Sequence, residues 1–212
     1  MALVRVVLIA AAVFSLTQNT LATDAIAQKR FMRIHGHANP PFGFVQFCRS
    51  FAEECHAQTP QHERFTATPH RLIELDEINR SVNVAVAPAT DRDIYGVEEY
   101  WTFPRLKGDC EDYVVLKRKL LMKRGWPASA LLITVVLDEN GDGHAVLTAR
   151  TVHGDFVLDN KYQEVRLWSQ TPYRFVMRQS YLNPKIWMSL DPRATVARVA
   201  SAKVASARPR SR

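Results

Sequence analysis

The sequence predicts an α+β fold in which N-terminal helices, with a cysteine-bearing helix at their centre, pack on an antiparallel sheet. Up to residue 124, apolar residues recur near the helical period of 3.6 residues. After residue 130 they form short runs rich in β-branched residues, and turn residues separate these runs. A chain of 212 residues fits one domain with a sizeable core, which we place at residues 28–191.

The two ends of the chain differ from the rest in composition. Residues 1–27 have the pattern of an export signal, because Arg5 precedes an apolar run over residues 6–16 and small residues follow. The run is shorter than the about 20 residues that span a membrane, although an uncleaved N-terminal anchor is the alternative. Residues 192–212 carry basic residues and no acid, which predicts a disordered basic tail.

The formal net charge of +7 originates in these ends. Arg5 and six basic residues after Asp191 account for it, which leaves 21 of the 28 basic residues against 21 acidic ones. Because the rest of the chain is electrically balanced, we expect no nucleic-acid partner. We expect a monomer located outside the cytoplasm.

Three cysteines offer one disulfide and one free thiol. Cys48 and Cys55 are close in sequence and could pair in an oxidising compartment, whereas Cys110 is distant. Residues 46–58 have helical character, and seven residues on one helix would separate the two Cα atoms by about 10 Å. A disulfide tolerates less than about 7 Å. The bond therefore requires a break in the helix, and two separate buried thiols are the alternative.

Other segments also precede the central cysteine. Residues 28–45 contain two consecutive prolines and no clear period, so we expect an irregular lead-in. Residues 70–84 are amphipathic and predict a helix. Residues 87–96, with Pro and Asp, predict a loop. The aromatic segment 100–104 either packs in the core or forms a wall of the cleft beside the cysteine.

The central helix is expected at residues 109–124. Asp109 is a suitable N-cap, acids follow in the first turn and basic residues occupy the last, as the helix dipole favours. Gly125 would end the helix. This arrangement places Cys110 in the first turn, and Lys117 interrupts the apolar face.

The strands follow this helix. They are expected at residues 131–137, 144–152, 156–159, 173–179 and 186–190. Residues 138–143 match the opening of a calcium-binding EF-hand loop, but the twelfth position is Ala149 instead of the required Glu. We therefore interpret 138–143 as a hairpin turn.

Three residues at element boundaries have the chemistry of a thiol enzyme. Cys110 lies at a helix N-terminus, where the dipole stabilises a thiolate. His144 begins a strand and can exchange a proton with that thiol, and Asp159 ends the next strand and can orient the imidazole. Separately, they could be a packing residue, a turn residue and a strand cap. Together and in this order, they favour a catalytic triad.

The triad can form only if the hairpin that joins the strands of His144 and Asp159 has a suitable register. A turn centred on His153 and Gly154 would leave His144 and Asp159 on one face but four positions out of register, about 13 Å along the strands. A wider loop nearer Thr151, or a bulge, would be needed to bring them together, and we expect one.

Acidic residues flank the cysteine. Asp109 and Glu111 either balance the helix dipole or bind calcium, which prefers clustered carboxylates. Negative charge beside a thiolate opposes its ionisation, so a neutralising cation would favour the chemistry of Cys110.

Three motifs in this order resemble the bacterial transglutaminase-like cysteine proteinases. They are GDCEDY at residues 108–113, GHAVL at 143–147 and FVLDN at 156–160. Tyr100, Trp101 and residues 173–187 also fit, so the resemblance covers roughly residues 40–190.

The resemblance implies a papain-like, transglutaminase-like core and a triad of Cys110, His144 and Asp159. The best understood members are periplasmic proteases that cleave surface adhesins and bind calcium through acids beside the cysteine, which here are Asp109 and Glu111. The resemblance therefore implies calcium as a cofactor, a periplasmic or secreted location, a protein substrate in the cell envelope and a membrane-bound regulator.

Three functions remain open at this point. In a thiol peptidase, Cys110 would attack a peptide carbonyl and its backbone N–H would donate to the oxyanion, with no second donor apparent from the sequence. A protein-glutamine acyl transferase would use the same triad with an amine as acceptor. A non-catalytic periplasmic binding protein could share the fold, but the presence of all three residue types disfavours it.

Overall fold

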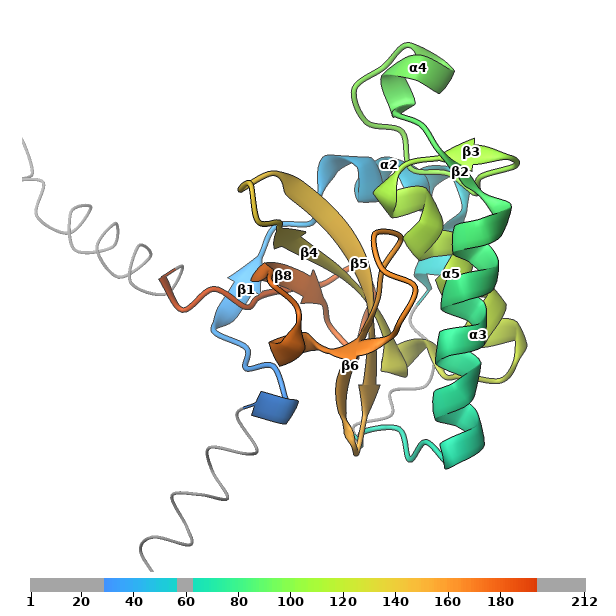
Figure 1. The fold of residues 1–212 in the computed structure, drawn as a ribbon. Coiled ribbons are helices and arrows are strands. Elements are labelled where there is room, and N and C mark those ends of the chain that lie inside the picture. Colours follow the sequence, from blue (N-terminus) through green and yellow to red (C-terminus); the bar gives the residue numbers. More distant parts are fainter. Residues whose placement is uncertain (1–28, 57–62, 194–212) are drawn as a thin grey trace, which may run out of the picture.

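The computed structural model describes residues 29–56 and 63–193, which form a mixed helix and antiparallel sheet fold (Figure 1). The predicted α+β class is confirmed. The expected export signal and residues 194–212 of the expected basic tail lie outside the described residues. Within the described ranges, no helix has the length and apolar character needed to cross a membrane.

The sheet has seven strands in the order β1-β9-β8-β4-β5-β6-β7, and all neighbouring strands are antiparallel. The helices and strands are β1 (Gly36–Ala38), α2 (Phe42–Ser50), α3 (Pro69–Ala85), β2 (Ala87–Pro88), α4 (Asp91–Tyr95), β3 (Lys107–Gly108), α5 (Cys110–Lys123), β4 (Leu131–Leu137), β5 (Gly143–Thr151), β6 (Gly154–Leu158), β7 (Arg166–Leu167), β8 (Arg174–Gln179) and β9 (Trp187–Ser189). Short 3₁₀ turns lie at Ala52–Cys55, Ala128–Ala130 and Trp168–Gln170. Strands β2 and β3 form a separate parallel pair.

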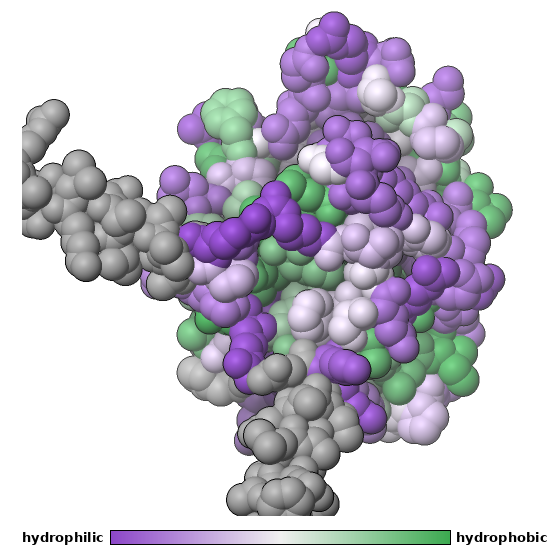
Figure 2. All heavy atoms as spheres, turned by 60° about the vertical axis from the view of Figure 1, so that its left-hand side comes forward, coloured by the Kyte–Doolittle hydropathy of each residue, from purple (hydrophilic) through white to green (hydrophobic). Residues whose placement is uncertain are grey.

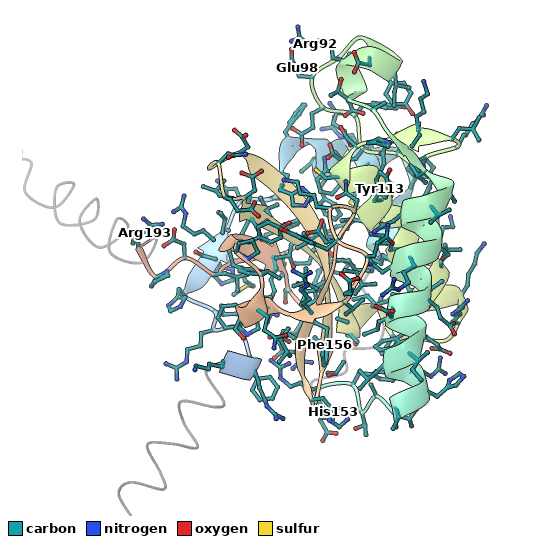
Figure 3. All side chains as sticks on the ribbon, in the orientation of Figure 1. Arg92, Glu98, Tyr113, His153, Phe156 and Arg193 are labelled. Carbon is teal, nitrogen blue, oxygen red and sulfur yellow. A yellow bond between two sulfur atoms is a disulfide. The ribbon has the colours of Figure 1, made fainter. Side chains whose placement is uncertain are left out.

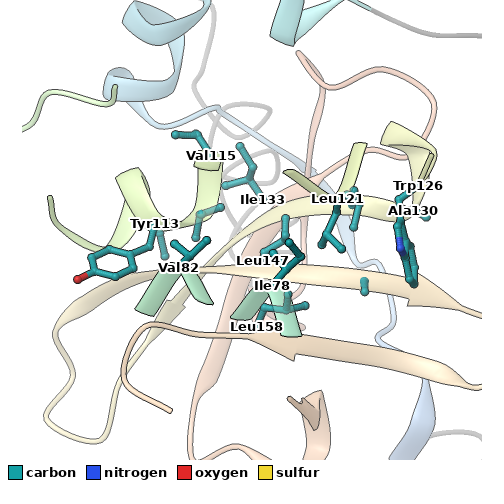
Figure 4. Packing of buried hydrophobic residues seen from close by; sticks show 14 of the residues in the cluster. Ile78, Val82, Tyr113, Val115, Leu121, Trp126, Ala130, Ile133, Leu147 and Leu158 are labelled. Carbon is teal, nitrogen blue, oxygen red and sulfur yellow. The ribbon is translucent and has the colours of Figure 1, made fainter. Parts of the chain in front are cut away.

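Helices α3 and α5 lie side by side and cover one face of the central strands (Figure 1). The Thr68 hydroxyl accepts the Arg71 N–H and Pro69 is the first helical residue, two features that favour a helix start at this point. Figure 4 shows the resulting core, to which the two helices and strands β4, β5 and β6 contribute. Its labelled members include Ile78, Val82, Tyr113, Val115, Leu121, Ile133, Leu147 and Leu158.

The predicted central helix is confirmed within one residue at each end. Asp109 occupies the N-cap position, but its side chain makes no capping hydrogen bond. Gly125 ends the helix with φ of +87°, a conformation that glycine adopts without strain. Lys117 interrupts the apolar pattern as expected, yet it is only 1 % exposed.

The N-terminal lead-in is more regular than predicted. It contains β1, and α2 begins at Phe42 directly after Pro41, a residue that is well suited to a helix start. The helix ends at Ser50, eight residues before the predicted end at residue 58. A 3₁₀ turn then returns the chain, so that Cys55 lies 5.6 Å from Cys48 between Cα atoms and forms a disulfide with it. The helix break that this bond requires is therefore present.

The prediction of a loop at residues 87–96 was incomplete. The segment contains β2 and the short helix α4, because the Thr90 hydroxyl accepts the Asp93 N–H and caps this helix. Arg92 and Glu98 form an ion pair at the tip of this region, away from the sheet (Figure 3).

The β5–β6 hairpin turns one residue earlier than predicted. A two-residue turn at 152–153 pairs Thr151 with Gly154 and Leu147 with Leu158. Gly154 has φ of +145°, which side chains rarely allow, and the Thr151 hydroxyl binds across the turn. The expected wider loop is therefore wrong: a tight turn halves the offset of His144 and Asp159 to two positions, about 7 Å along the strands.

The opposite face of the sheet carries the chain that precedes β1. Asp155 is fully buried, accepts the Met32 N–H at 2.7 Å and pairs with Arg64 at 2.6 Å. A smaller apolar cluster fills the rest of this face and includes Met32, Val136, Val146, Tyr173 and Phe175. In Figure 2, hydrophilic side chains cover much of the visible surface and apolar ones lie between them.

Candidate active site

Cys110 is the first residue of α5 and the free cysteine of the described chain. Its Sγ donates to Glu111 Oε2 at 3.1 Å and accepts the Ala145 N–H at 3.4 Å. Strand β6 pairs with β5 only from Leu147 onward, so the Ala145 N–H is available to the sulfur. The thiol thus lies between a helix N-terminus and the start of a strand, with a carboxylate as its acceptor.

His144 and Asp159 form a buried hydrogen-bonded pair. Nε2 of His144 lies 2.9 Å from Oδ1 of Asp159, and their side chains are 4 % and 3 % exposed. The Tyr173 hydroxyl donates to Oδ2 of the same carboxylate at 2.5 Å, and its ring meets the imidazole edge-on with centroids 5.6 Å apart. Both oxygens of Asp159 are therefore engaged.

The protonation of Asp159 follows from its contacts. Burial raises the pKa of Asp159, but the hydrogen bond and charge of His144 and the Tyr173 hydroxyl outweigh it and hold that pKa below its ordinary value. An ionised carboxylate accepts a hydrogen from Nε2 of His144. Nδ1 is then the ring nitrogen that can take a proton from another group.

Cys110 and His144 line one cavity of about 280 Å³. Its other walls include Trp101 from the aromatic segment, Val135 from β4 and Met177 from β8. Cys48 lies in a different cavity, so the disulfide is not part of this one. The structure therefore gathers Cys110, His144 and Asp159 at one site, with the thiol and the imidazole facing a common space.

Trp101 has both roles that were considered for the aromatic segment: it packs in the core and it forms a wall of the cleft. It is 5 % exposed, belongs to the main core and packs edge-on against Phe44 at 5.8 Å. It also lines the cavity, where its Nε1 donates to Glu99 at 2.9 Å. A Cβ on Gly43 would lie 2.4 Å from the Trp101 ring, so a glycine in α2 is what permits this position.

Three carboxylates converge beside the thiol. Oxygen atoms of Asp91, Asp109 and Glu111 lie within 4.8 Å of one another. One buried oxygen each of Asp91 and Asp109 has no hydrogen-bond partner, and none of the three forms an ion pair within the described chain. Buried oxygen ligands without counter-charge fit a hard divalent cation such as calcium.

The raised pKa values of Asp109 and its neighbour Asp112 reflect the same excess of negative charge. Burial and the nearby Glu111 carboxylate raise the pKa of Asp109 to about 8. Burial raises the pKa of Asp112 to about 7, even though the Thr102 N–H donates to its Oδ1 at 2.9 Å. Without a cation, these groups retain protons that exposed carboxyls would release.

The family model described as bacterial transglutaminase-like cysteine proteinase BTLCP matches residues 34–195. The chain belongs to this family. It is therefore a transglutaminase-like cysteine peptidase, and the match includes every residue of the site described above.

Solved structures of LapG from Legionella pneumophila are similar to this bacterial transglutaminase-like cysteine proteinase. The calcium-bound form is 22 % identical over 63 % of this chain and 82 % of LapG, with a TM-score of 0.49. The EGTA-treated form is 25 % identical over 55 % and 66 %, with a TM-score of 0.47. No curated protein sequence matched the chain.

In this family member, the surroundings of Cys110 oppose thiolate formation. Burial, followed by the charge and hydrogen bond of Glu111, raises the pKa of the thiol well above its ordinary value, and the Ala145 N–H only partly offsets this. A group that neutralises Glu111 would therefore favour ionisation of the Cys110 thiol.

Several residues of this site were not predicted from the sequence. Asp91 lies 18 positions before Asp109, in a segment expected to be a loop, and no spacing rule connects the two. Tyr173 was expected only as the start of a strand. Asn79 was part of a predicted helix, yet its side chain binds the backbone of Asp159 at 3.0 Å. For Asn79 and Tyr173, the available signal was a polar group, an amide or a hydroxyl, at a position that faces the core.

Proposed function

We propose that this cysteine peptidase is exported and hydrolyses a peptide bond in an envelope or surface protein, with Cys110, His144 and Asp159 as its catalytic triad. One observation carries the proposal. Nε2 of His144 is held by Asp159, while Nδ1 is left for the cavity that His144 shares with Cys110. The pattern of residues 1–27 supports export.

The proposed reaction begins with proton transfer from Cys110 Sγ to His144 Nδ1. The thiolate attacks the peptide carbonyl carbon, and the oxyanion accepts the Cys110 N–H, which as a first-turn group has no partner within the helix. His144 then gives its proton to the leaving amine. Water, deprotonated by His144, cleaves the thioester and regenerates the thiol.

Asp159 keeps the imidazole in the required tautomer and stabilises the imidazolium that forms in each half-reaction. Asp91, Asp109 and Glu111 are the residues that would hold calcium. Bound there, calcium would supply positive charge beside the sulfur, and Glu111 would be its ligand instead of the acceptor of the thiol.

The first test is the rate of Cys110 alkylation by iodoacetamide against pH, in the wild-type protein and in His144→Ala, with calcium and with a chelator. Cys48 and Cys55 are joined, so alkylation reports on one sulfur of the described chain. We expect a thiol pKa below 8.5 with calcium, a higher one in His144→Ala, and a higher one after chelation. A profile indifferent to His144 would overturn the triad.

A second test separates hydrolysis from acyl transfer. Casein is incubated with the protein and a fluorescent primary amine, with Cys110→Ala as the control. New casein fragments in the absence of amine incorporation support the peptidase. Covalent labelling of glutamine side chains by the amine would assign acyl transfer to the same triad instead.

A further inference from the structure

Lys117 is a buried cation that the proposed reaction does not use. It lies on α5 about two turns after Cys110, on the face that packs towards α3, and is 1 % exposed. It forms no ion pair with any described residue; its Nζ donates to Oδ1 of Asn79 on α3 at 2.8 Å. A buried ammonium without an ion pair is costly, so its surroundings require an explanation.

Asn79 connects this ammonium to the backbone of Asp159. Its Oδ1 accepts both Lys117 Nζ and the Asp159 N–H, the latter at 3.0 Å. Its Nδ2 donates to the carbonyls of Tyr162 at 2.8 Å and Gln163 at 3.0 Å. All hydrogen-bonding positions of this buried amide are thus in use.

The ammonium also favours one of the two orientations of the amide. A lysine ammonium can only donate, so Oδ1 of Asn79 must face Lys117, and Nδ2 must then face the two carbonyls. The reversed amide would place two N–H donors against Lys117 and the Asp159 N–H. Lys117 therefore favours the one orientation in which Asn79 holds the chain at Asp159.

This contact matters because the sheet does not hold Asp159. Strand β6 ends at Leu158 and β7 begins at Arg166, so Asp159 and the residues after it lie outside the ladder. Asn83 on α3 adds a second contact, since its Nδ2 donates to the Asp159 carbonyl at 2.9 Å. Helix side chains, more than strand pairing, fix the backbone that carries the carboxylate.

We propose that Lys117 is a positioning residue of the active site, which orients the Asn79 amide and through it holds Asp159 against His144. This inference rests on the proposed triad. It makes α5 responsible for both ends of the catalytic machinery, because one helix presents the nucleophile at its N-terminus and anchors the aspartate from its middle. Figure 1 shows α3 and α5 side by side in the arrangement that this connection needs.

The charges around Lys117 are consistent with this role. Burial lowers the pKa of Lys117 to about 7, and the negative charge of Asp159 opposes that decrease. Helix α3 presents the neutral Asn79, and on α5 itself the Tyr113 ring lies 5.6 Å from Nζ. The attraction between Lys117 and Asp159 therefore acts in the same direction as the hydrogen bonds through Asn79.

The test uses iodoacetamide alkylation of Cys110 against pH in calcium-containing buffer. The proteins compared are wild type, His144→Ala, Lys117→Met, Lys117→Gln, Asn79→Ala and the double variant Lys117→Met/Asn79→Ala. Lys123→Met is the matched control, because Lys123 lies on the same helix and is exposed. Thermal melts establish that each variant is folded at the assay temperature.

We expect Lys117→Met to raise the thiol pKa by about one unit, towards the value of His144→Ala, so that alkylation at pH 7 slows about tenfold. Lys117→Gln keeps an N–H donor for Asn79 and should regain most of the rate. The double variant should be alkylated no more slowly than Asn79→Ala, because both substitutions break the same connection from Lys117 through Asn79 to Asp159. Lys123→Met should match wild type.

Other outcomes separate this inference from the proposed function. A wild-type profile in folded Lys117→Met, or in Asn79→Ala if Lys117→Met does not fold, together with a shifted profile in His144→Ala, would overturn the role of Lys117 and leave the triad intact. The role of Lys117 would also be overturned if the losses of alkylation rate add up in the double variant and Lys117→Gln does not recover the rate. That combination would indicate a structural role alone. A wild-type profile in His144→Ala would overturn the triad itself.

Discussion

The Sγ of Cys110 donates a hydrogen bond to the carboxylate of Glu111, its neighbour in α5. The proton of this thiol is therefore directed towards an acid and not towards the imidazole of His144. A carboxylate in this position raises the thiol pKa through its charge and through the bond itself. The reactivity of the Cys110 thiol therefore depends on whether the Glu111 carboxylate also binds another group.

Glu111→Gln should make the thiol more reactive when calcium is absent. The substitution removes the charge that opposes thiolate formation, so we expect the pKa of Cys110 to fall by about one unit and alkylation by iodoacetamide at pH 7 to be about tenfold faster in chelator. Glu99→Gln is the control, because Glu99 lines the same cavity but its carboxylate binds Trp101. An unchanged rate in Glu111→Gln would contradict the inhibitory role of this carboxylate.

Stability without calcium should fall as pH rises from 5 to 8. The pKa values of Asp109 and Asp112 are raised to about 8 and about 7, so the folded state binds protons that the unfolded chain releases near pH 4. Their contribution to stability is fully present below the unfolded pKa and is lost as pH passes the folded one. Thermal melts in chelator should show the fall, and Asp109→Asn should reduce it.

Calcium should act in the opposite direction, because a bound cation favours ionised carboxylates. We expect the melting temperature to rise on addition of calcium, and to rise more at pH 8 than at pH 5. Equal melting temperatures with and without calcium at pH 8 would refute the assignment of Asp91, Asp109 and Glu111 as its ligands.

Tyr173→Phe should weaken both catalysis and stability. Loss of the hydroxyl leaves Oδ2 of Asp159 buried without a donor, which costs about 1–3 kcal/mol. Because that hydrogen bond favours the ionised carboxylate, the pKa of Asp159 should rise and the acid limb of activity should move to higher pH. Denaturant unfolding and a pH profile measure the two effects.

Tyr162→Phe is the matched control for this change. Its hydroxyl binds the exposed Glu139, so its loss should alter stability by less than about 0.5 kcal/mol and leave the pH profile in place. A Tyr173→Phe protein indistinguishable from Tyr162→Phe would show that the contact to Asp159 has no energetic role.

Gly43→Ala should displace Trp101 from the wall of the cavity. The new Cβ would lie 2.4 Å from Cδ1 of the indole, and such overpacking typically costs about 1–3 kcal/mol. Tryptophan fluorescence and denaturant unfolding should both change. Gly143→Ala is the comparison, because a Cβ there meets no atom within 4 Å. Equal stabilities of the two variants would mean that Trp101 is not confined by Gly43.

Local patterns predicted the elements that carry the site. The helix after Asp109 and the strand at Leu131–Leu137 were predicted within one residue, because periodicity, the helix dipole and Gly125 all act within a few residues. The lead-in to α2 and the segment containing α4 were less accurate. Both elements are short, and the pattern of a short element is weak.

The contacts between elements were not predictable in the same way. The sequence suggested that His144 and Asp159 face one side of a hairpin, but their distance depends on the register, and a one-residue change in the turn moved it by two positions. Asp91 reaches the acids beside Cys110 only because β2, just before α4, pairs with β3, just before α5. Neither the spacing of His144 and Asp159 nor the approach of Asp91 is determined by a short stretch of neighbouring residues.

By itself, the sequence determined the α+β order of elements, the thiol at a helix start and the presence of histidine and aspartate at strand boundaries, because backbone preferences and apolar periodicity are local. The tertiary structure decided that the Ala145 N–H donates to Cys110 Sγ, that Tyr173 and Asn79 hold Asp159, and that Lys117 is buried. These contacts join residues from separate elements, and only the packing of helices on the sheet, with its demand that buried polar groups find partners, brings them within bonding distance.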